Sequence, residues 1–180
     1  MEAEMENLRE RTLKELFSAL EGVSGSALEC RYYPCHFEGQ DCTFCYCPFY
    51  PCLIPDTGGK LKGNVWSCME CTWVHQRENV ERIIEVLSVY PRQRLVEENW
   101  HFFNAILQTL LFGSEVGVWQ DGNYSLLGLA GSDAEGFLAV KLQDFQIVEV
   151  LESPDTSSLK SYVMIPVTHS FPVSENDDAK

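Results

Sequence analysis

The sequence predicts an α+β fold, in which a small, irregular, metal-stabilised cysteine-rich module is joined to helices and an antiparallel β meander. Three observations predict this class. All eight cysteines of the 180-residue chain fall between Cys30 and Cys71. Apolar residues recur at helical spacing on both sides of that stretch. After Gly113 the apolar pattern changes to a period of two, which is typical of strands.

Residues 1–28 are predicted to contain an N-terminal helix. Apolar side chains recur at i, i+3, i+4 and i+7 along one face: Leu13, Leu16, Phe17 and Leu20. Gly22 ends the helix. We expect the apolar face to pack on the same protein, and a helix kept for a partner is the alternative.

The stretch 29–91 is predicted to be a cysteine-rich module with a trailing helix from Gln76 to Pro91. Four prolines before residue 56 exclude long helices around the cysteines, and the Gly63–Asn64 pair marks a turn. Fewer than ~50 residues cannot build a sufficient core alone. Bound metal is therefore expected to supply folding energy to this module.

Three roles compete for the eight thiols. Disulfides are disfavoured because the chain starts with an acidic, amphipathic segment that lacks the features of a secretion signal, which favours a reducing cytoplasmic location. A single catalytic cysteine would stand apart from the others, and none does. Metal binding explains the spacing, since Cys42–Cys45 and Cys68–Cys71 are C-x2-C turns that each present two thiolates to one ion.

The spacing favours two quartets of ligands. The C-x2-C turns make the first: Cys42, Cys45, Cys68 and Cys71. Two C-x4-C pairs make the second: Cys30, Cys35, Cys47 and Cys52. Such sulfur sites suit Zn²⁺, which we expect in both, with iron or [4Fe–4S] clusters as the alternative. His36 and His75 are possible alternate ligands, and a capping or exposed residue is the other interpretation of His75.

Residues 92–173 are predicted to form an α+β domain, with an acidic tail at 174–180. A single apolar stripe indicates a helix over 94–112 that Gly113 closes. His101 lies beside this stripe and is interpreted as a packing or surface residue. About five strands follow, predicted at residues 116–120, 124–130, 136–143, 145–151 and 161–168. Nothing in this part nominates an active site.

The charge excludes several classes of function. The net charge is −14, and two four-thiolate sites would bring it to about −18. A nucleic-acid-binding protein normally shows a basic face to phosphate, so nucleic acid is not an expected partner. The sequence has no apolar run near the ~20 residues of a membrane span, and no P-loop, GxGxxG, GxSxG or HExxH motif. An enzyme acting alone is the least supported class.

Two runs of the sequence closely resemble a known family. ECRYYPCHFEGQDCTFCYCPFYPC and GNVWSCMECTWVHQRENVERIIEVL are similar to the cysteine-rich small domain family, also called zinc-finger-like, over about residues 29–87. Members of that family are prokaryotic, many of them archaeal, and stand alone or are appended to cobamide-synthesis enzymes such as threonine-phosphate decarboxylase. The resemblance implies metal binding and little more about function.

The leading functional expectation is a non-catalytic metal-binding protein, in which metal rigidifies a surface for a protein partner. The alternatives are an iron–sulfur electron-transfer protein, and a metal carrier or accessory subunit of a corrinoid or other cofactor enzyme. Redox titration separates electron transfer from a structural role, because zinc has no redox chemistry.

Overall fold

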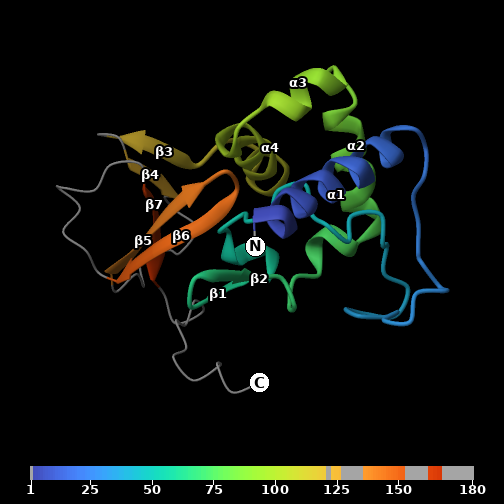
Figure 1. The fold of residues 1–180 in the computed structure, drawn as a ribbon, viewed down its shortest axis with the longest axis horizontal. Coiled ribbons are helices and arrows are strands. Elements are labelled where there is room, and N and C mark those ends of the chain that lie inside the picture. The colour runs from blue at the N-terminus through green and yellow to red at the C-terminus, as the bar shows by residue number, and fades with distance from the viewer. Residues whose placement is uncertain (1, 121–122, 127–135, 153–161, 168–180) are drawn as a thin grey trace. The chain divides into compact units, whose positions relative to one another are not determined.

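The computed structural model describes residues 2–120, 123–126, 136–152 and 162–167 (Figure 1). Within these ranges the chain has four α-helices, a two-stranded sheet and a five-stranded sheet, and much of the cysteine-rich stretch is irregular. The predicted α+β class is confirmed. The chain divides into two compact units, residues 1–50 with 71–98 and residues 51–70 with 99–180. The domain boundaries expected at residues 28, 91 and 173 stay a prediction.

The first unit is built on helices α1, Glu2–Leu20, and α2, Arg77–Leu87, which pack against each other. Leu16 from α1 and Ile83 from α2 are fully buried. The helices expected at the N-terminus and after Gln76 are therefore confirmed. A short helix α3, Arg92–Glu97, follows Pro91, which cannot continue α2.

The single helix expected over 94–112 is wrong, because the structure divides it into α3 and α4, Trp100–Phe112. Glu98 is extended, with ψ 152°. Asn99 is the N-cap of α4, and its side chain accepts a hydrogen bond from the backbone N–H of Phe102 at 3.0 Å. The apolar stripe continues across this break, so periodicity alone does not reveal it. Asparagine, in contrast, is a residue type that often begins a helix.

The second unit contains α4 and a hairpin of β1, Lys60–Lys62, and β2, Val65–Ser67. The expected turn at Gly63 joins the two strands, and Gly63 has a left-handed φ of 57°. Gly113 closes α4 in the left-handed conformation, as expected, with φ 81°. The middle of α4 is apolar and buried, through Phe103 and Leu107 among others.

All five predicted strands are present in the second unit. They are β3, Gly117–Gln120; β4, Asn123–Leu126; β5, Gly136–Gln143; β6, Gln146–Glu152; and β7, Tyr162–Val167. The order is β3-β4-β7-β5-β6, and three of the four pairings are antiparallel. The strands therefore do not follow one another as a simple meander: β7 lies between β4 and β5 and pairs with β4 in parallel.

The central place of β7 agrees with its composition. Val163, Met164 and Ile165 are all buried, and three successive buried apolar residues suit a strand that is covered on both faces. A period of two marks the strands but does not encode their order. The acidic tail expected at 174–180 lies outside the described residues.

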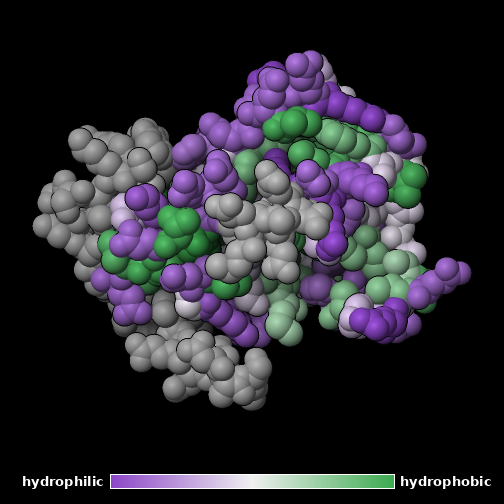
Figure 2. Space-filling model, viewed as in Figure 1, coloured by the Kyte–Doolittle hydropathy of each residue, from purple (hydrophilic) through white to green (hydrophobic). Residues whose placement is uncertain are grey.

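The surface of the described residues is mixed in character (Figure 2). Hydrophilic side chains gather over α3 in this view. Val89 and Val96 are among the large apolar residues that are exposed. Among the helices that the structure describes, none is long and apolar enough to cross a membrane.

Candidate metal centre

Two chain segments of the first unit, residues 24–26 and 40–43, are hydrogen bonded to each other beside Cys42. Gly25 accepts a hydrogen bond from the backbone N–H of Cys42 at 2.9 Å and donates to the hydroxyl of Thr43 at 3.0 Å. The Ser26 hydroxyl donates to the carbonyl of Gln40 at 2.5 Å. These contacts fix the Cys42–Cys45 turn against the segment that leads to Cys30, without any regular secondary structure.

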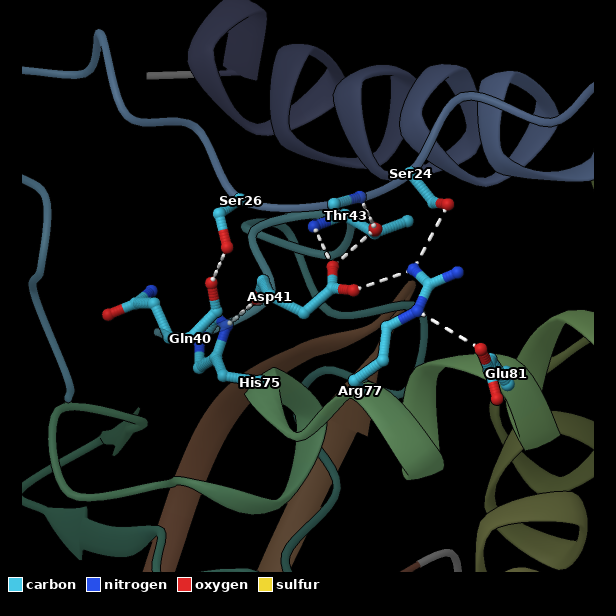
Figure 3. A network of polar contacts seen from close by, with 9 residues as sticks. Ser24, Ser26, Gln40, Asp41, Thr43, His75, Arg77 and Glu81 are labelled. Atoms are coloured by element: carbon cyan, nitrogen blue, oxygen red, sulfur yellow. Dashed lines mark hydrogen bonds and ion pairs between the residues drawn. The ribbon is translucent and has the colours of Figure 1, made fainter. Parts of the chain in front are cut away.

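Asp41 organises the start of this turn (Figure 3). Its carboxylate accepts from the backbone N–H of Thr43 at 2.8 Å and from the hydroxyl of the same residue, and it forms an ion pair with Arg77 at 2.8 Å. Burial alone would raise the pKa of Asp41, but the hydrogen bonds from Thr43 and Arg77 outweigh it and hold the pKa below its usual value. Asp41 is therefore a charged group that ties the Cys42 turn to α2.

His75 is held against the same turn. Its Nδ1 lies 2.9 Å from the carbonyl oxygen of Asp41, and the backbone N–H of Asp41 donates back to the His75 carbonyl at 2.7 Å. A carbonyl only accepts, so Nδ1 carries the proton and Nε2 keeps its lone pair. Burial, with a smaller contribution from His36, lowers the pKa of His75 and favours this neutral form. The interpretation of His75 as an exposed residue is wrong, since only 4% of it is exposed.

The two histidines singled out from the sequence lie together. The rings of His36 and His75 have their centroids 4.1 Å apart, and Nδ1 of His36 lies 3.2 Å from the sulfur of Cys35. An imidazole pair therefore stands beside a thiol, which is a combination of donors that Zn²⁺ accepts. Their role as alternate ligands stays a prediction.

Gln40 is a polar side chain that the cysteine pattern did not single out. It is completely buried. Its Oε1 accepts from the backbone N–H groups of His36 and Phe37 at 2.7 and 3.3 Å, and its Nε2 lies 3.3 Å from the sulfur of Cys35 and 3.6 Å from that of Cys42. One amide nitrogen thus lies next to two sulfurs.

Negative groups crowd around Cys45. Burial and then the charge of Glu15 raise the pKa of the Cys45 thiol to about 11, with further contributions from three cysteines: Cys42, Cys35 and Cys30. Glu15 reaches this place from α1 and accepts from the backbone N–H of Tyr46 at 3.0 Å. Burial raises the pKa of Glu15 itself to about 7. Such a cluster disfavours thiolate charge unless a cation accompanies it.

None of the eight cysteines, all of which the structure describes, is joined in a disulfide. Cys47 accepts a hydrogen bond from the backbone N–H of Phe49, with nitrogen and sulfur 3.4 Å apart. Cys52 and Cys71 are buried, and Cys68 follows β2 directly. The sulfur of Cys52 lies 3.7 Å from the hydroxyl of Thr57.

The donor set fits a thiophilic ion by its chemistry. Thiols and imidazoles are the ligands that zinc and iron sites use, and mutual repulsion among thiolates is relieved by a divalent cation. In the part of the chain that the structure describes, no three cysteine, histidine or acidic side chains converge as ligands of one ion do. The two predicted quartets and the metal itself therefore stay predictions.

Comparison with known proteins identifies the class. Residues 22–94 match the sequence profile of the cysteine-rich small domain, and the chain belongs to this family. The chain is 39% identical over 80 residues to an uncharacterized protein of Methanocaldococcus jannaschii, a match that covers 42% of this chain and 67% of that protein.

A second relative is a much longer protein. It is a probable cobalt-factor III C(17)-methyltransferase of Methanothermobacter thermautotrophicus, to which the chain is 57% identical over 61 residues. This match covers 33% of the chain and only 17% of the methyltransferase. No solved structure matches the chain.

Proposed function

We propose that the protein is a non-catalytic, metal-binding accessory module whose cysteines hold two thiophilic ions, with zinc expected in both. The observation that carries this proposal is the gathering of three other cysteines and the carboxylate of Glu15 near Cys45, where the pKa of the thiol reaches about 11. Potential thiolates gathered together repel one another when they ionise, and a cation among them offsets this repulsion.

The expected role of the metal is structural. The residues proposed to hold it are the eight cysteines, with His36 and His75 as alternates. Four protein ligands around Zn²⁺ leave no open position for a substrate, which is typical of structural sites. Such an ion contributes about 10–16 kcal/mol of apparent binding energy in small zinc-binding peptides, and typical domains have a net stability of about 5–15 kcal/mol.

The proposed partner is an enzyme that builds or modifies a cobalt-containing tetrapyrrole. In M. thermautotrophicus, a stretch of 61 residues that matches this chain is part of a probable cobalt-factor III C(17)-methyltransferase. The present chain is proposed to contribute a module of the same kind to such an enzyme. Its own residues after 98 are then available to position the module on the enzyme.

Metal analysis of protein purified without oxygen tests the metal. We expect about two zinc ions per chain. A brown protein whose visible absorption is bleached by dithionite would replace zinc by iron–sulfur clusters and favour electron transfer. A folded protein that contains no metal and binds none would overturn the proposal.

Binding to the methyltransferase tests the partner. The probe is the M. thermautotrophicus enzyme without the 61 residues that match this chain, checked for folding by circular dichroism. We expect the truncated enzyme to bind the present chain and the full-length enzyme to bind it more weakly, because its own domain occupies the same place. Equal or absent binding to both forms would contradict the proposed partner and leave the metal proposal unaffected.

A further inference from the structure

We propose that the surface on which α1 packs is a docking surface for an amphipathic helix of the partner enzyme, and that α1 occupies it in the free protein. We call this surface the helix seat. It consists of the buried face of α2, with Val80, Ile83 and Leu87, and of the backbone N–H of Tyr46. The inference rests on the proposed function for its partner, and it requires no metal ion.

The seat lies within the first unit, to which α1, α2 and Tyr46 all belong. The three apolar side chains of α2 follow one another at i, i+3 and i+7, so they share one face of the helix, and all three are fully buried. α1 packs against α2 (Figure 1), and its Glu15 accepts from the Tyr46 N–H at 3.0 Å. An apolar helix face with a backbone donor beside it suits an amphipathic helix.

α1 lies outside the family module that it covers. The family match covers residues 22–94, which include α2 and Tyr46 and begin after α1 has ended. A module limited to these residues lacks the α1 side chains that pack on α2, so apolar area of the seat would meet water. The seat is thus a surface of the module itself, and α1 is the occupant that this chain provides.

α1 is held on the seat by a narrow apolar stripe. Within residues 8–20 of this helix, whose side chains the structure describes, Thr12, Leu16 and Ala19 are buried, and the other apolar side chains are at least partly exposed. Leu16 is the one large apolar side chain of the three. A helix with a wider apolar stripe buries more apolar area on the same seat and competes with α1.

Two of the polar contacts that hold α1 lie at the surface. Arg11 donates to the Tyr46 hydroxyl at 3.0 Å, and Glu21, just after the helix, forms an ion pair with Arg92. Contacts between exposed charged groups contribute little to stability. Displacement of α1 therefore breaks mainly the contacts of Leu16 and Glu15 with the seat.

These features define the helix of the partner. It carries apolar side chains at helical spacing, and beside them a side-chain acceptor that replaces Glu15 on the Tyr46 N–H. Because this helix and α1 compete for one seat, the apparent affinity for the enzyme is reduced by the fraction of molecules in which the seat is open. Loosening α1 must then tighten enzyme binding.

A fluorescent peptide of residues 2–21 tests the seat without the enzyme. Fluorescence anisotropy measures its binding to the full chain, either wild type or Leu16→Ala, and circular dichroism checks that both are folded. Leu16→Ala loosens the helix in cis and leaves every residue of the seat in place. The peptide is therefore expected to bind this variant at least ~10-fold more tightly than the wild type. Equal or absent binding to the two folded chains would overturn the seat.

Glu15 variants keep the inference testable where Leu16→Ala fails to fold. Glu15→Ala removes only the acceptor for the Tyr46 N–H, so it is expected to tighten peptide binding in the same direction but by less. Glu15→Gln keeps an acceptor and should bind the peptide as the wild type does. Lys14→Ala, at an exposed position of the same helix, is the matched control and should change nothing. Identical binding by Glu15→Ala and Lys14→Ala would overturn the role of α1.

Hydrogen exchange with the truncated M. thermautotrophicus enzyme identifies the occupant. The backbone amides of α1 are expected to exchange faster in the complex than in the free chain, because the enzyme displaces this helix. Enzyme that binds and leaves the exchange of α1 unchanged would overturn the seat and leave the proposed partner standing. Absence of binding to the wild type and to the loosened variants would overturn the proposed partner itself. A wild-type dimer that the peptide dissociates would assign the seat to a second copy of this chain and overturn the enzyme as its occupant.

Discussion

A buried polar chain in the second unit joins α4 to the cysteine-rich loop and to the start of β3. Asn104 donates to the carbonyl of Cys52 at 2.8 Å, and Gln108 donates to Oδ1 of Asn104 at 2.7 Å. The Oε1 of Gln108 accepts from the backbone N–H groups of Val116 and Gly117, both at 2.6 Å. Asn104 and Gln108 are 1% and 0% exposed, so water does not replace a lost partner.

We predict that Asn104→Leu destabilises the protein strongly, although leucine has nearly the same size. The substitution leaves two buried groups without these contacts, the Cys52 carbonyl and the Gln108 amide. Each unsatisfied group costs about 1–3 kcal/mol, so the expected loss for the two groups is about 2–6 kcal/mol. This is a large fraction of the ~5–15 kcal/mol that typical domains have.

Urea unfolding followed by circular dichroism at a constant zinc concentration measures this loss. Thr109→Ala on the same helix is the control, since it removes an exposed hydroxyl that donates to Ala105 at 2.9 Å, and its effect is expected to stay within about 0.5 kcal/mol. The transition must keep its slope for the comparison to hold. An Asn104→Leu variant as stable as the control would refute the account of this polar chain.

Three further predictions concern single side chains. Glu15→Ala should destabilise the chain by about 1–2 kcal/mol in urea unfolding, because the Tyr46 N–H loses its acceptor, and Glu15→Gln should recover most of this. Arg77→Met should shift the midpoint of acid unfolding to higher pH. The ion pair with Arg77 stabilises the ionised form of Asp41, and this contribution is present above the unfolded-state pKa of Asp41 and is lost as the pH falls. An unchanged acid midpoint would count against the prediction. Burial lowers the pKa of His101, so the folded state favours the neutral imidazole, and stability is lost as the pH falls below the usual histidine pKa of 6.5. The melting temperature of His101→Gln should therefore depend less on pH between 7.5 and 5 than that of the wild type.

Much of the fold could be predicted because its elements are amphipathic. The faces of α1 and α2, and the five strands, follow from periodicity alone. The break between Glu98 and Asn99 was missed because it depends on one capping side chain and leaves the stripe intact. The place of β7 between β4 and β5 depends on competition among strands for the centre of the sheet, which no local pattern records.

The candidate site could be predicted only as far as its donor types. The clustered cysteines and the two histidines near them can be recognised in the sequence as potential metal ligands, and His36 and His75 do lie together in the structure. Gln40 and Glu15 are ordinary residues in the sequence, and their importance comes from burial beside thiols. Glu15 lies 31 residues from its backbone partner Tyr46 and reaches it only because α1 packs over the turn.

The same crowding that raises the pKa of Cys45 bears on how the proposed metal would bind. A thiol with a pKa of about 11 holds its proton at neutral pH, so an ion must displace that proton to bind. Once bound, the cation reverses the repulsion between the sulfurs and Glu15, because the group that disfavoured a lone thiolate now faces a positive centre. Affinity for the proposed metal is then expected to rise with pH, because the thiol releases its proton when the ion binds. If the proposed metal binds there, the gathering of Glu15 and several cysteines near Cys45 would make the metal-free protein less stable relative to the metal-bound one.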